Sequence, residues 1–349
     1  MPLPALYGHD ALRRRLAASI PTHRLPQVIL LEGPRGVGKQ RLGLWLAQAI
    51  LCDRPGDEGG CGSCRSCRLV STLSHPDLHW FIPVETTKKG ADADKQVELV
   101  QQALDEEVAA RREQPFYQAP TGLASHGIAS VRLLSRQLHL TPVLARYKVF
   151  LIGDAERLIP QRSSPEAANA LLKALEEPPA NTTFVLTSAE PDALLPTMLS
   201  RVVRIRVARL NDSVVTEFVQ RELPADAQRN VRQLVADSDG CIGRVLATIA
   251  GTTDSDEHAV DAFLSASRRS QVDRLAIALG QPPFQARGAF TRVLDGLLDR
   301  LRSEARSGKD TAAVVAAIAR VLDAREMAQG NVNPQLVAAV LADELWSGS

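Results

Sequence analysis

The stretch Gly33-Pro34-Arg35-Gly36-Val37-Gly38-Lys39-Gln40 decides the fold of this chain. The apolar run 28–31 before it predicts a buried strand, and the apolar spacing of residues 42–49 after it predicts a helix. A strand, a glycine-rich turn, a lysine and a helix form the layout of a phosphate-binding loop, in which backbone N–H groups and the lysine meet phosphate oxygens. The candidate nucleotide-binding residues are Gly33, Gly36, Gly38 and Lys39.

Two positions of this layout depart from an active ATPase. A hydroxyl should follow the lysine to hold Mg²⁺, and Gln40 has none. A second apolar run, 149–152, predicts a buried strand that ends in Gly153-Asp154, whereas an ATPase places its metal-binding Asp at the first of these positions. The sequence therefore predicts a nucleotide-binding fold without metal chemistry. It leaves ATP binding open, and a glycine-rich turn that never binds nucleotide is the alternative.

A cysteine cluster follows the predicted loop helix. Its members are spaced C-x8-C-x2-C-x2-C, and they are Cys52, Cys61, Cys64 and Cys67. Four thiolates suit a tetrahedral Zn²⁺ ion, and four glycines between residues 56 and 62 permit the tight turns that such a knuckle needs. We therefore expect a structural zinc site, with an iron–sulfur cluster as the competing assignment. Cys241 stands apart from the cluster, and we expect it to be a small core residue.

The composition limits the class of protein. With 349 residues, the chain is long enough for two or three domains with a sizeable core. Its net charge of +1, and the lack of aromatic residues among the basic ones, disfavour a stand-alone zinc-containing DNA-binding protein. Neither a signal-peptide pattern nor an apolar run of about 20 residues occurs. These features predict a cytoplasmic protein without a membrane partner.

Several further motifs lie along the chain. Residues 167–179 predict a helix that two prolines close, and residues 184–188 and 203–207 predict strands. Leu199-Ser200-Arg201 lies between these two strands. Residues 85–127 are polar and weakly periodic, and we expect them to be an insertion with a charged helix at 97–112 and a mobile part.

These motifs together resemble bacterial clamp-loader subunits of the AAA+ class, and most closely the delta-prime branch of the DNA polymerase III loader. The residues that carry the resemblance are 33–39, the four clustered cysteines, 169–179, Leu199-Ser200-Arg201 and 331–336. The resemblance implies an α/β fold. Residues 1–208 would form an AAA+ P-loop parallel-sheet domain, which contains the zinc-binding module (52–67) and the insertion (85–127). It also implies a small helical lid domain at 209–252 and an all-helical collar domain at 253–349.

The resemblance implies a non-hydrolysing subunit in a hetero-pentamer with gamma/tau and delta subunits. Such an assembly loads the sliding clamp (beta) onto primer–template DNA. Arg201 would enter a neighbour's ATP site as a catalytic arginine finger in trans, and the alternative is a surface arginine that pairs with a carboxylate. The sensor arginine of active subunits aligns with Gly243, and Arg244 is one place away. An active gamma/tau-like ATPase is the alternative function, and a helical bundle without an assembly role is the alternative for the collar.

Overall fold

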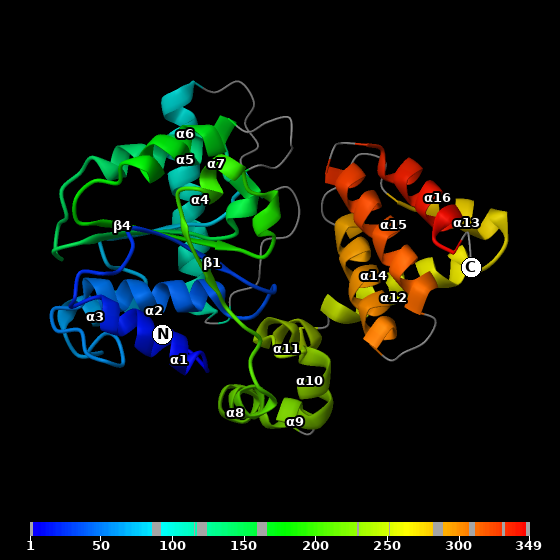
Figure 1. The fold of residues 1–349 in the computed structure, drawn as a ribbon, viewed down its shortest axis with the longest axis horizontal. Helices are drawn as coiled ribbons and strands as arrows, with labels where there is room; N and C mark the ends of the chain where they lie inside the picture. The colour runs from blue at the N-terminus through cyan, green and yellow to red at the C-terminus, as the bar shows by residue number, and fades with distance from the viewer. Residues whose placement is uncertain are drawn as a thin grey trace. The chain divides into compact units, whose positions relative to one another are not determined.

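The computed structural model divides the chain into two compact units (Figure 1). The first unit comprises the described residues up to Leu246, and the second comprises those from Ala247 onward. The structure describes residues 3–85, 92–114, 116, 124–158, 166–228, 230–250, 252–281, 289–306, 311–329 and 332–346.

A five-stranded parallel sheet forms the centre of the first unit, in the order β2-β3-β4-β1-β5. The strands are β1 (Val28–Glu32), β2 (Leu78–Phe81), β3 (Lys148–Ile152), β4 (Thr182–Ser188) and β5 (Val203–Arg206). Every residue of β3 and β4 is buried, including the polar residues Lys148, Thr182, Thr183, Thr187 and Ser188 at the strand ends. The apolar centres of the two strands are the runs visible in the sequence. The four predicted strands are confirmed. The edge strand β2 was not predicted, because its sequence Leu-His-Trp-Phe shows neither a continuous apolar run nor a strict alternation of apolar and polar residues.

Helices cover both faces of this sheet. Figure 1 shows α1, α2 and α3 on one face and α4, α5, α6 and α7 on the other. The first group is α1 (Asp10–Ser19), α2 (Lys39–Leu51) and α3 (Arg65–Ser71), and the second is α4 (Ala93–Glu113), α5 (Ile128–Leu138), α6 (Glu166–Glu176) and α7 (Pro196–Leu199). Two short 3₁₀ helices, η1 (Ala155–Leu158) and η2 (Pro191–Ala193), follow β3 and β4. The helix predicted within 167–179 is confirmed as α6.

The structure changes the interpretation of residues 85–127. Helix α4 is longer than the predicted 97–112, and its residues Val97, Val100 and Leu104 are buried in the main core. Asp92 caps its start by accepting the N–H of Lys95 at 2.8 Å. The described part of this segment therefore contributes a helix that packs in the core. The prediction gave no bounds for the mobile part, and residues 86–91, 115 and 117–123 of this segment lie outside the described residues.

Two buried charges fix the loop between α5 and β3. The Asp77 carboxylate accepts the backbone N–H groups of residues 143–145 at 2.6–2.8 Å. The Lys148 ammonium donates to carbonyl oxygens at the end of α5, among them that of Leu138 at 2.7 Å. Burial raises the pKa of Asp77, but the three N–H donors lower it further, so that it lies below the usual value. The loop backbone is thus held by charge-assisted hydrogen bonds at both ends.

Four helices follow β5 and close the first unit, with α11 continuing past its boundary. They are α8 (Asp212–Glu222), α9 (Ala225–Gln228), α10 (Val231–Ser238) and α11 (Ile242–Ile249). They enclose a small core of their own around Phe218, against which the Tyr7 ring packs edge-on at 5.4 Å. The Leu210 N–H donates to the Gly240 carbonyl at 2.9 Å, and this bond joins the segment between β5 and α8 to the turn before α11.

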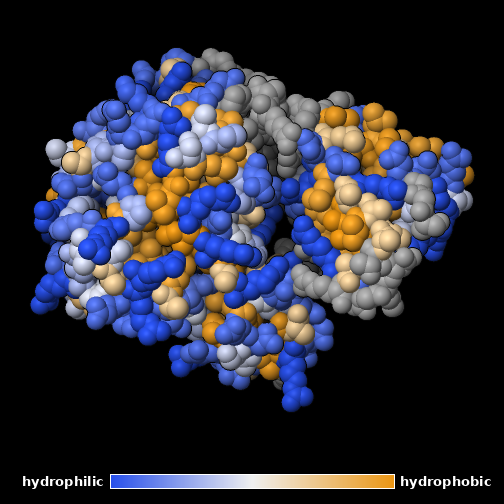
Figure 2. All heavy atoms as spheres, in the orientation of Figure 1, coloured by the Kyte–Doolittle hydropathy of each residue, from blue (hydrophilic) through white to orange (hydrophobic). Residues whose placement is uncertain are grey.

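The described elements of the second unit are all helical. They are α12 (Thr252–Ser267), α13 (Gln271–Leu279), α14 (Ala289–Arg306), α15 (Thr311–Gln329) and α16 (Pro334–Glu344). Asn333 begins α16 by accepting the Gln335 N–H at 2.9 Å, and Pro334 occupies the first helical position. The Asn-Pro-Gln motif is therefore a helix start. Figure 2 shows hydrophobic side chains at the surface of this unit as well as polar ones. No helix in the described part of the chain is both long and apolar enough to span a bilayer.

Candidate nucleotide-binding loop, cysteine cluster and Arg201

The glycine-rich loop lies between β1 and α2, where the sequence predicts it. Gly36 and Gly38 have positive φ angles of 79° and 101°, which glycine adopts without strain. A Cβ at Gly33 would lie 2.3 Å from the Val207 carbonyl oxygen, so the loop backbone passes directly against the end of β5. These three glycines are therefore required by local geometry.

Lys39 is folded onto its own loop. Its side chain is 6% exposed, and Nζ donates to the carbonyl oxygens of Gly33 and Pro34 at 2.8 Å each. Burial lowers the pKa of Lys39, and the carboxylates of Glu156 and Asp154 act in the opposite direction. The ammonium group thus has the loop's own carbonyl oxygens as acceptors.

Gln40 and Gly153, the two departures from an active ATPase, fit each other in space. A Cβ at Gly153 would lie 2.8 Å from Oε1 and 2.9 Å from Cδ of Gln40. The Gln40 amide therefore fills the space that the Cβ of any other residue at position 153 would need. Its Nε2 donates to Oδ2 of Asp154 at 3.3 Å, a long hydrogen bond that ties the amide to the second acidic position.

The lid helices touch the loop through a contact between two glycines. The Gly243 N–H donates to the Gly36 carbonyl at 2.9 Å. A Cβ at Gly243 would lie only 2.5 Å from the Gly36 Cα, so a residue with a side chain does not fit there. Arg244 points elsewhere, with Nη1 3.7 Å from Oδ2 of Asp239. The sequence aligned Gly243 with a sensor arginine, but it could not show that the start of α11 rests on the loop.

The N-terminal segment reaches the same loop from another side. His9 Nε2 lies 3.0 Å from the Val37 carbonyl oxygen, and burial lowers the pKa of this histidine. A neutral ring with its proton on Nε2 donates this hydrogen bond. The Tyr7 hydroxyl donates to Glu222 at 2.6 Å, so the segment also binds the lid. Residues before α1 therefore contact both the loop and the lid helices.

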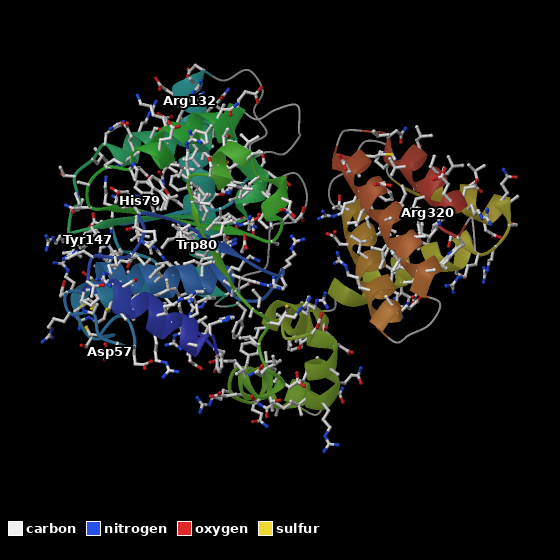
Figure 3. All side chains as sticks on the ribbon, viewed as in Figure 1. Asp57, His79, Trp80, Arg132, Tyr147 and Arg320 are labelled. Atoms are coloured by element: carbon white, nitrogen blue, oxygen red, sulfur yellow. The ribbon has the colours of Figure 1, made fainter. Side chains whose placement is uncertain are left out.

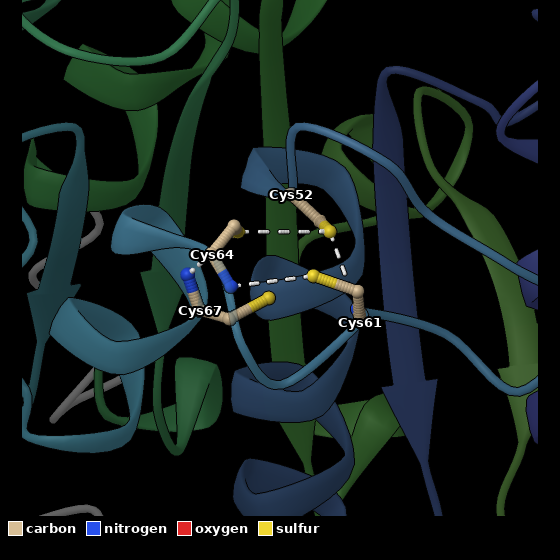
Figure 4. Close-up of side chains that lie close together, drawn as sticks. All are labelled: Cys52, Cys61, Cys64 and Cys67. Atoms are coloured by element: carbon tan, nitrogen blue, oxygen red, sulfur yellow. Dashed lines mark hydrogen bonds between the residues drawn. The ribbon is translucent and has the colours of Figure 1, made fainter.

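The four clustered cysteines come together at the start of α3, as the spacing predicts (Figure 4). Their sulfur atoms all lie within 4.8 Å of one another, and the Cys52 and Cys64 sulfurs are 3.9 Å apart. A tetrahedral zinc site with Zn–S bonds of about 2.3 Å places its sulfurs about 3.8 Å apart. The cluster therefore has the size of a Cys₄ metal site.

The surroundings of the sulfurs suit thiolates. Backbone N–H groups point at three of them, including Cys61 N–H to Cys52 Sγ at 3.2 Å and Cys67 N–H to Cys64 Sγ at 3.4 Å. The Ser63 hydroxyl and backbone N–H donors lower the pKa of Cys61 to about 6. Burial raises the pKa of Cys52 and of Cys67, which a bound cation would offset.

The loop that joins Cys52 to Cys61 packs tightly on α2. Asp57, labelled in Figure 3, lies in this loop. Gly59 has a φ of 105°, and a Cβ there would lie 2.6 Å from the Trp45 ring. The module is therefore anchored to the helix that the phosphate-binding loop begins. Cys241 is fully buried and outside the cluster, as predicted.

Arg201 follows α7 in an exposed turn. Its Nε donates to Oε1 of Glu176 at 2.7 Å, and Nη2 forms an ion pair with the same carboxylate. Its Nη1 donates to the Thr197 carbonyl at 2.6 Å and to the Ser200 hydroxyl at 3.2 Å. The structure therefore places Arg201 in a surface ion pair. Among the described contacts, none joins Arg201 to the loop or to the cysteines.

The fold and the site together define a P-loop protein of the AAA+ class, with the loop after a central strand and a helical lid resting on it. The family model described as "DNA polymerase III, delta subunit" matches residues 8–211, and the chain belongs to this family. The match includes the loop, the cysteine cluster and Arg201.

Curated relatives agree with this family. The chain is 32% identical over 211 residues to the DNA polymerase III subunit delta' of Pseudomonas aeruginosa, which covers 60% of this chain and 52% of the relative. It is 29% identical over 228 residues to the delta' subunit of Escherichia coli, covering 65% and 56%. It is also 26% identical over 212 residues to the tau/gamma subunit of Haemophilus influenzae, covering 61% and 24%. The matched region thus spans about half the length of the delta' relatives.

A gamma subunit-related protein of Thermotoga maritima is similar in structure. It shares 15% identity, with a TM-score of 0.45, over 97% of this chain and 98% of that one.

Proposed function

We propose that this chain is a non-hydrolysing, delta-prime-like subunit of the replicative clamp loader. It would join gamma/tau and delta subunits in a cytoplasmic hetero-pentamer that places the sliding clamp on primer–template DNA. Family membership and the delta' relatives support this assignment. One observation carries the non-hydrolysing role: the chain's own groups take up the contacts of the phosphate-binding loop. Lys39 donates to the loop carbonyl oxygens, the Gln40 amide lies against Gly153, and Gly243 lies against Gly36.

The physical argument concerns the metal and the lysine. Phosphoryl transfer depends on Mg²⁺ to neutralise charge on the transferring group. Gln40 offers no hydroxyl, and Gly153 offers no carboxylate, so neither group expected to fix that ion is present. A nucleotide would also have to draw Lys39 from two carbonyl oxygens and lift Gly243 from the loop. We therefore propose that the loop serves as a structural element.

The second candidate is an active gamma/tau-like ATPase. Lys39 and Asp154 are retained, and a tau/gamma subunit is among the relatives. Steady-state ATP turnover by the purified chain, compared with its Lys39→Ala variant, separates the two functions. We expect no Mg²⁺-dependent turnover above that of the variant. Turnover that Lys39→Ala abolishes would establish the active ATPase.

We further propose that the cysteine cluster holds one structural Zn²⁺ ion. Four sulfurs complete a tetrahedral shell and leave no coordination position for water or substrate. The ion would tie the loop that begins at Cys52 to the start of α3, and so brace α2 behind the phosphate-binding loop.

We propose that Arg201 acts in trans as an arginine finger in a neighbour's ATP site. The side chain is 30% exposed, and its guanidinium is always charged and offers a planar set of donors that suits phosphate oxygens. In a reconstituted loader, Arg201→Ala should leave assembly intact and lower ATP turnover. Normal turnover by a correctly assembled complex would show a surface arginine only.

The proposed domains are 1–208, 209–252 and a collar at 253–349. On the collar, α13 exposes Val272, Leu275 and Leu279, and the packed neighbour α16 exposes Leu336 and Val340. These side chains are 40–76% exposed, and together they form an apolar face that a neighbouring subunit would cover. We propose that this α13–α16 face helps assemble the ring.

Assembly is tested by mixing the chain with gamma/tau and delta subunits and measuring the mass of the complex. We expect a defined hetero-pentamer, which Leu275→Asp should weaken because it places a charge in the covered face. Val315→Asp on α15, where the side chain is equally exposed at 54%, is the matched control and should assemble normally. Equal assembly by both variants would contradict the α13–α16 face, and failure of the unmodified chain to join would contradict the loader assignment.

A further inference from the structure

The guanidinium of Arg201 is held by two helices at once. The Nε–Nη2 edge binds Oε1 of Glu176, the last residue of α6. The Nη1 group binds the Thr197 carbonyl of α7 and the Ser200 hydroxyl. An arginine has five N–H donors. These contacts engage four of them and leave one, on Nη2, without a partner in the described part of the chain.

Fold stability gives little reason for this ion pair. The Glu176 side chain is 45% exposed, and exposed ion pairs add little to stability. Glu176 also ends α6, where the helix dipole disfavours a negative charge. We therefore relate the Glu176 carboxylate to the position of the Arg201 side chain rather than to the stability of α6.

We infer that Glu176 is a latch that restrains Arg201 until an anionic phosphate competes for the same guanidinium edge. This inference rests on the proposed role of Arg201 as an arginine finger. Two parallel N–H donors are what a bidentate phosphate contact needs. In this structure Glu176 occupies the Nε–Nη2 edge, and Thr197 with Ser200 occupies Nη1. The terminal phosphate of a nucleoside triphosphate on a neighbouring subunit has to displace the carboxylate before Arg201 binds it.

The latch sets the fraction of time in which Arg201 is free. A ligand that binds only the released arginine has an apparent affinity reduced by the fraction of chains in which Arg201 is restrained. Weakening the restraint therefore raises the fraction of chains that can bind the ligand. Because the pair is exposed, the expected change is about two- to five-fold. Salt screens exposed charges over about 10 Å at 0.1 M, so the latch should weaken as ionic strength rises.

The test uses the reconstituted loader carrying Glu176→Gln, which keeps the shape of the side chain and removes its charge. ATP turnover without clamp and DNA should rise about two- to five-fold. Turnover with saturating clamp and DNA should stay at the unmodified rate, because there the arginine is already released. The matched control is Glu177→Gln, an equal charge change at the next exposed residue, and it should leave both rates unchanged.

Arg201→Ala and the double variant Arg201→Ala/Glu176→Gln complete the design. If Arg201→Ala lowers turnover and the double variant matches it, Glu176 acts through Arg201. If Arg201→Ala lowers turnover but Glu176→Gln leaves the basal rate unchanged or reduced, the latch is overturned and the finger stands. If Arg201→Ala has no effect, the finger is overturned and the latch falls with it.

A second readout uses the isolated chain. The Arg201 Nε–H resonance should be protected from solvent exchange in the unmodified protein and should lose this protection in Glu176→Gln. Unchanged exchange in that variant would overturn the latch whatever the loader assay gives.

Discussion

The contact between Gly243 and Gly36 makes a quantitative prediction for Gly243→Ala. The added Cβ would lie 2.5 Å from the Gly36 Cα and 3.3 Å from the Gly36 carbonyl oxygen. Carbon atoms in contact prefer about 3.5–4.0 Å, so one of the two backbones has to move by about 1 Å or more. Both contact atoms belong to backbone, which cannot turn aside as the end of a side chain can.

The cost follows from two effects. Overpacking of one methyl group costs about 1–3 kcal/mol, and loss of the bond from the Gly243 N–H to Gly36 costs about 1 kcal/mol. Replacement of glycine by alanine stabilises the folded state by about 0.4–1 kcal/mol, because the unfolded chain loses conformational entropy. The net cost is about 1–3 kcal/mol, and separation of α11 from the loop is the movement that relieves it.

Hydrogen exchange is the assay that detects this movement locally. Peptides covering residues 33–39 and 240–246 should exchange about 5- to 150-fold faster in Gly243→Ala, the rate change that corresponds to 1–3 kcal/mol. Peptides from α13 to α16 should be unchanged. Gly56→Ala is the control, because Gly56 lies in the same unit, has no positive φ and has open space around its Cβ position.

Exchange that is equally slow in Gly243→Ala and in the unmodified protein would refute the reasoning. It would mean that the lid does not rest on the phosphate-binding loop in solution. The argument that the chain's own lid closes this loop would then fail, and the loop would be open to a ligand.

Three more predictions concern the metal, the loop and a buried carboxylate. Elemental analysis should give about one zinc per chain, and Cys61→Ser should lower that content; iron, or no metal in reduced protein, would contradict this. Gln40→Thr alone should create no ATP turnover, because the carboxylate at position 153 is still missing. Asp77→Asn should lower the free energy of unfolding by about 2–4 kcal/mol in urea melts, since an amide cannot accept three N–H groups as well. Because the folded pKa of Asp77 lies below its unfolded value near 3.8, its contribution should be full above pH 4 and vanish as the pH falls further.

Much of the fold was predictable from local patterns. The apolar runs at β1, β3 and β4 identify buried strands, and the glycines and Lys39 identify the loop between β1 and α2. The edge strand β2 was not predicted, because His79 interrupts its apolar residues without producing the alternation that β5 shows. Its His79 ring stacks on Phe150 of β3, a contact that only the sheet creates, at 4.7 Å between ring centroids.

The sequence predicted the charged helix that became α4 but not its packing in the core, for a physical reason. A 21-residue helix with charges on most of its surface needs only a narrow apolar stripe to pack, and Val97, Val100 and Leu104 form that stripe. The polar composition of residues 85–127 as a whole made this apolar stripe hard to recognise. The pattern of residues three and four apart was the signal that could have identified a core helix.

The sequence by itself determined the features that depend on near neighbours along the chain. These are the glycine-rich loop and the cysteine cluster, because turn geometry and ligand spacing act over a few residues. Only the tertiary structure decided how distant residues share space. The fit of Gln40 to Gly153, the contact of Gly243 with Gly36, and the pairing of Arg201 with Glu176 join residues 25 to 207 positions apart. Spacing along the chain carries no information about such contacts, because the packing of strands and helices sets which side chains meet.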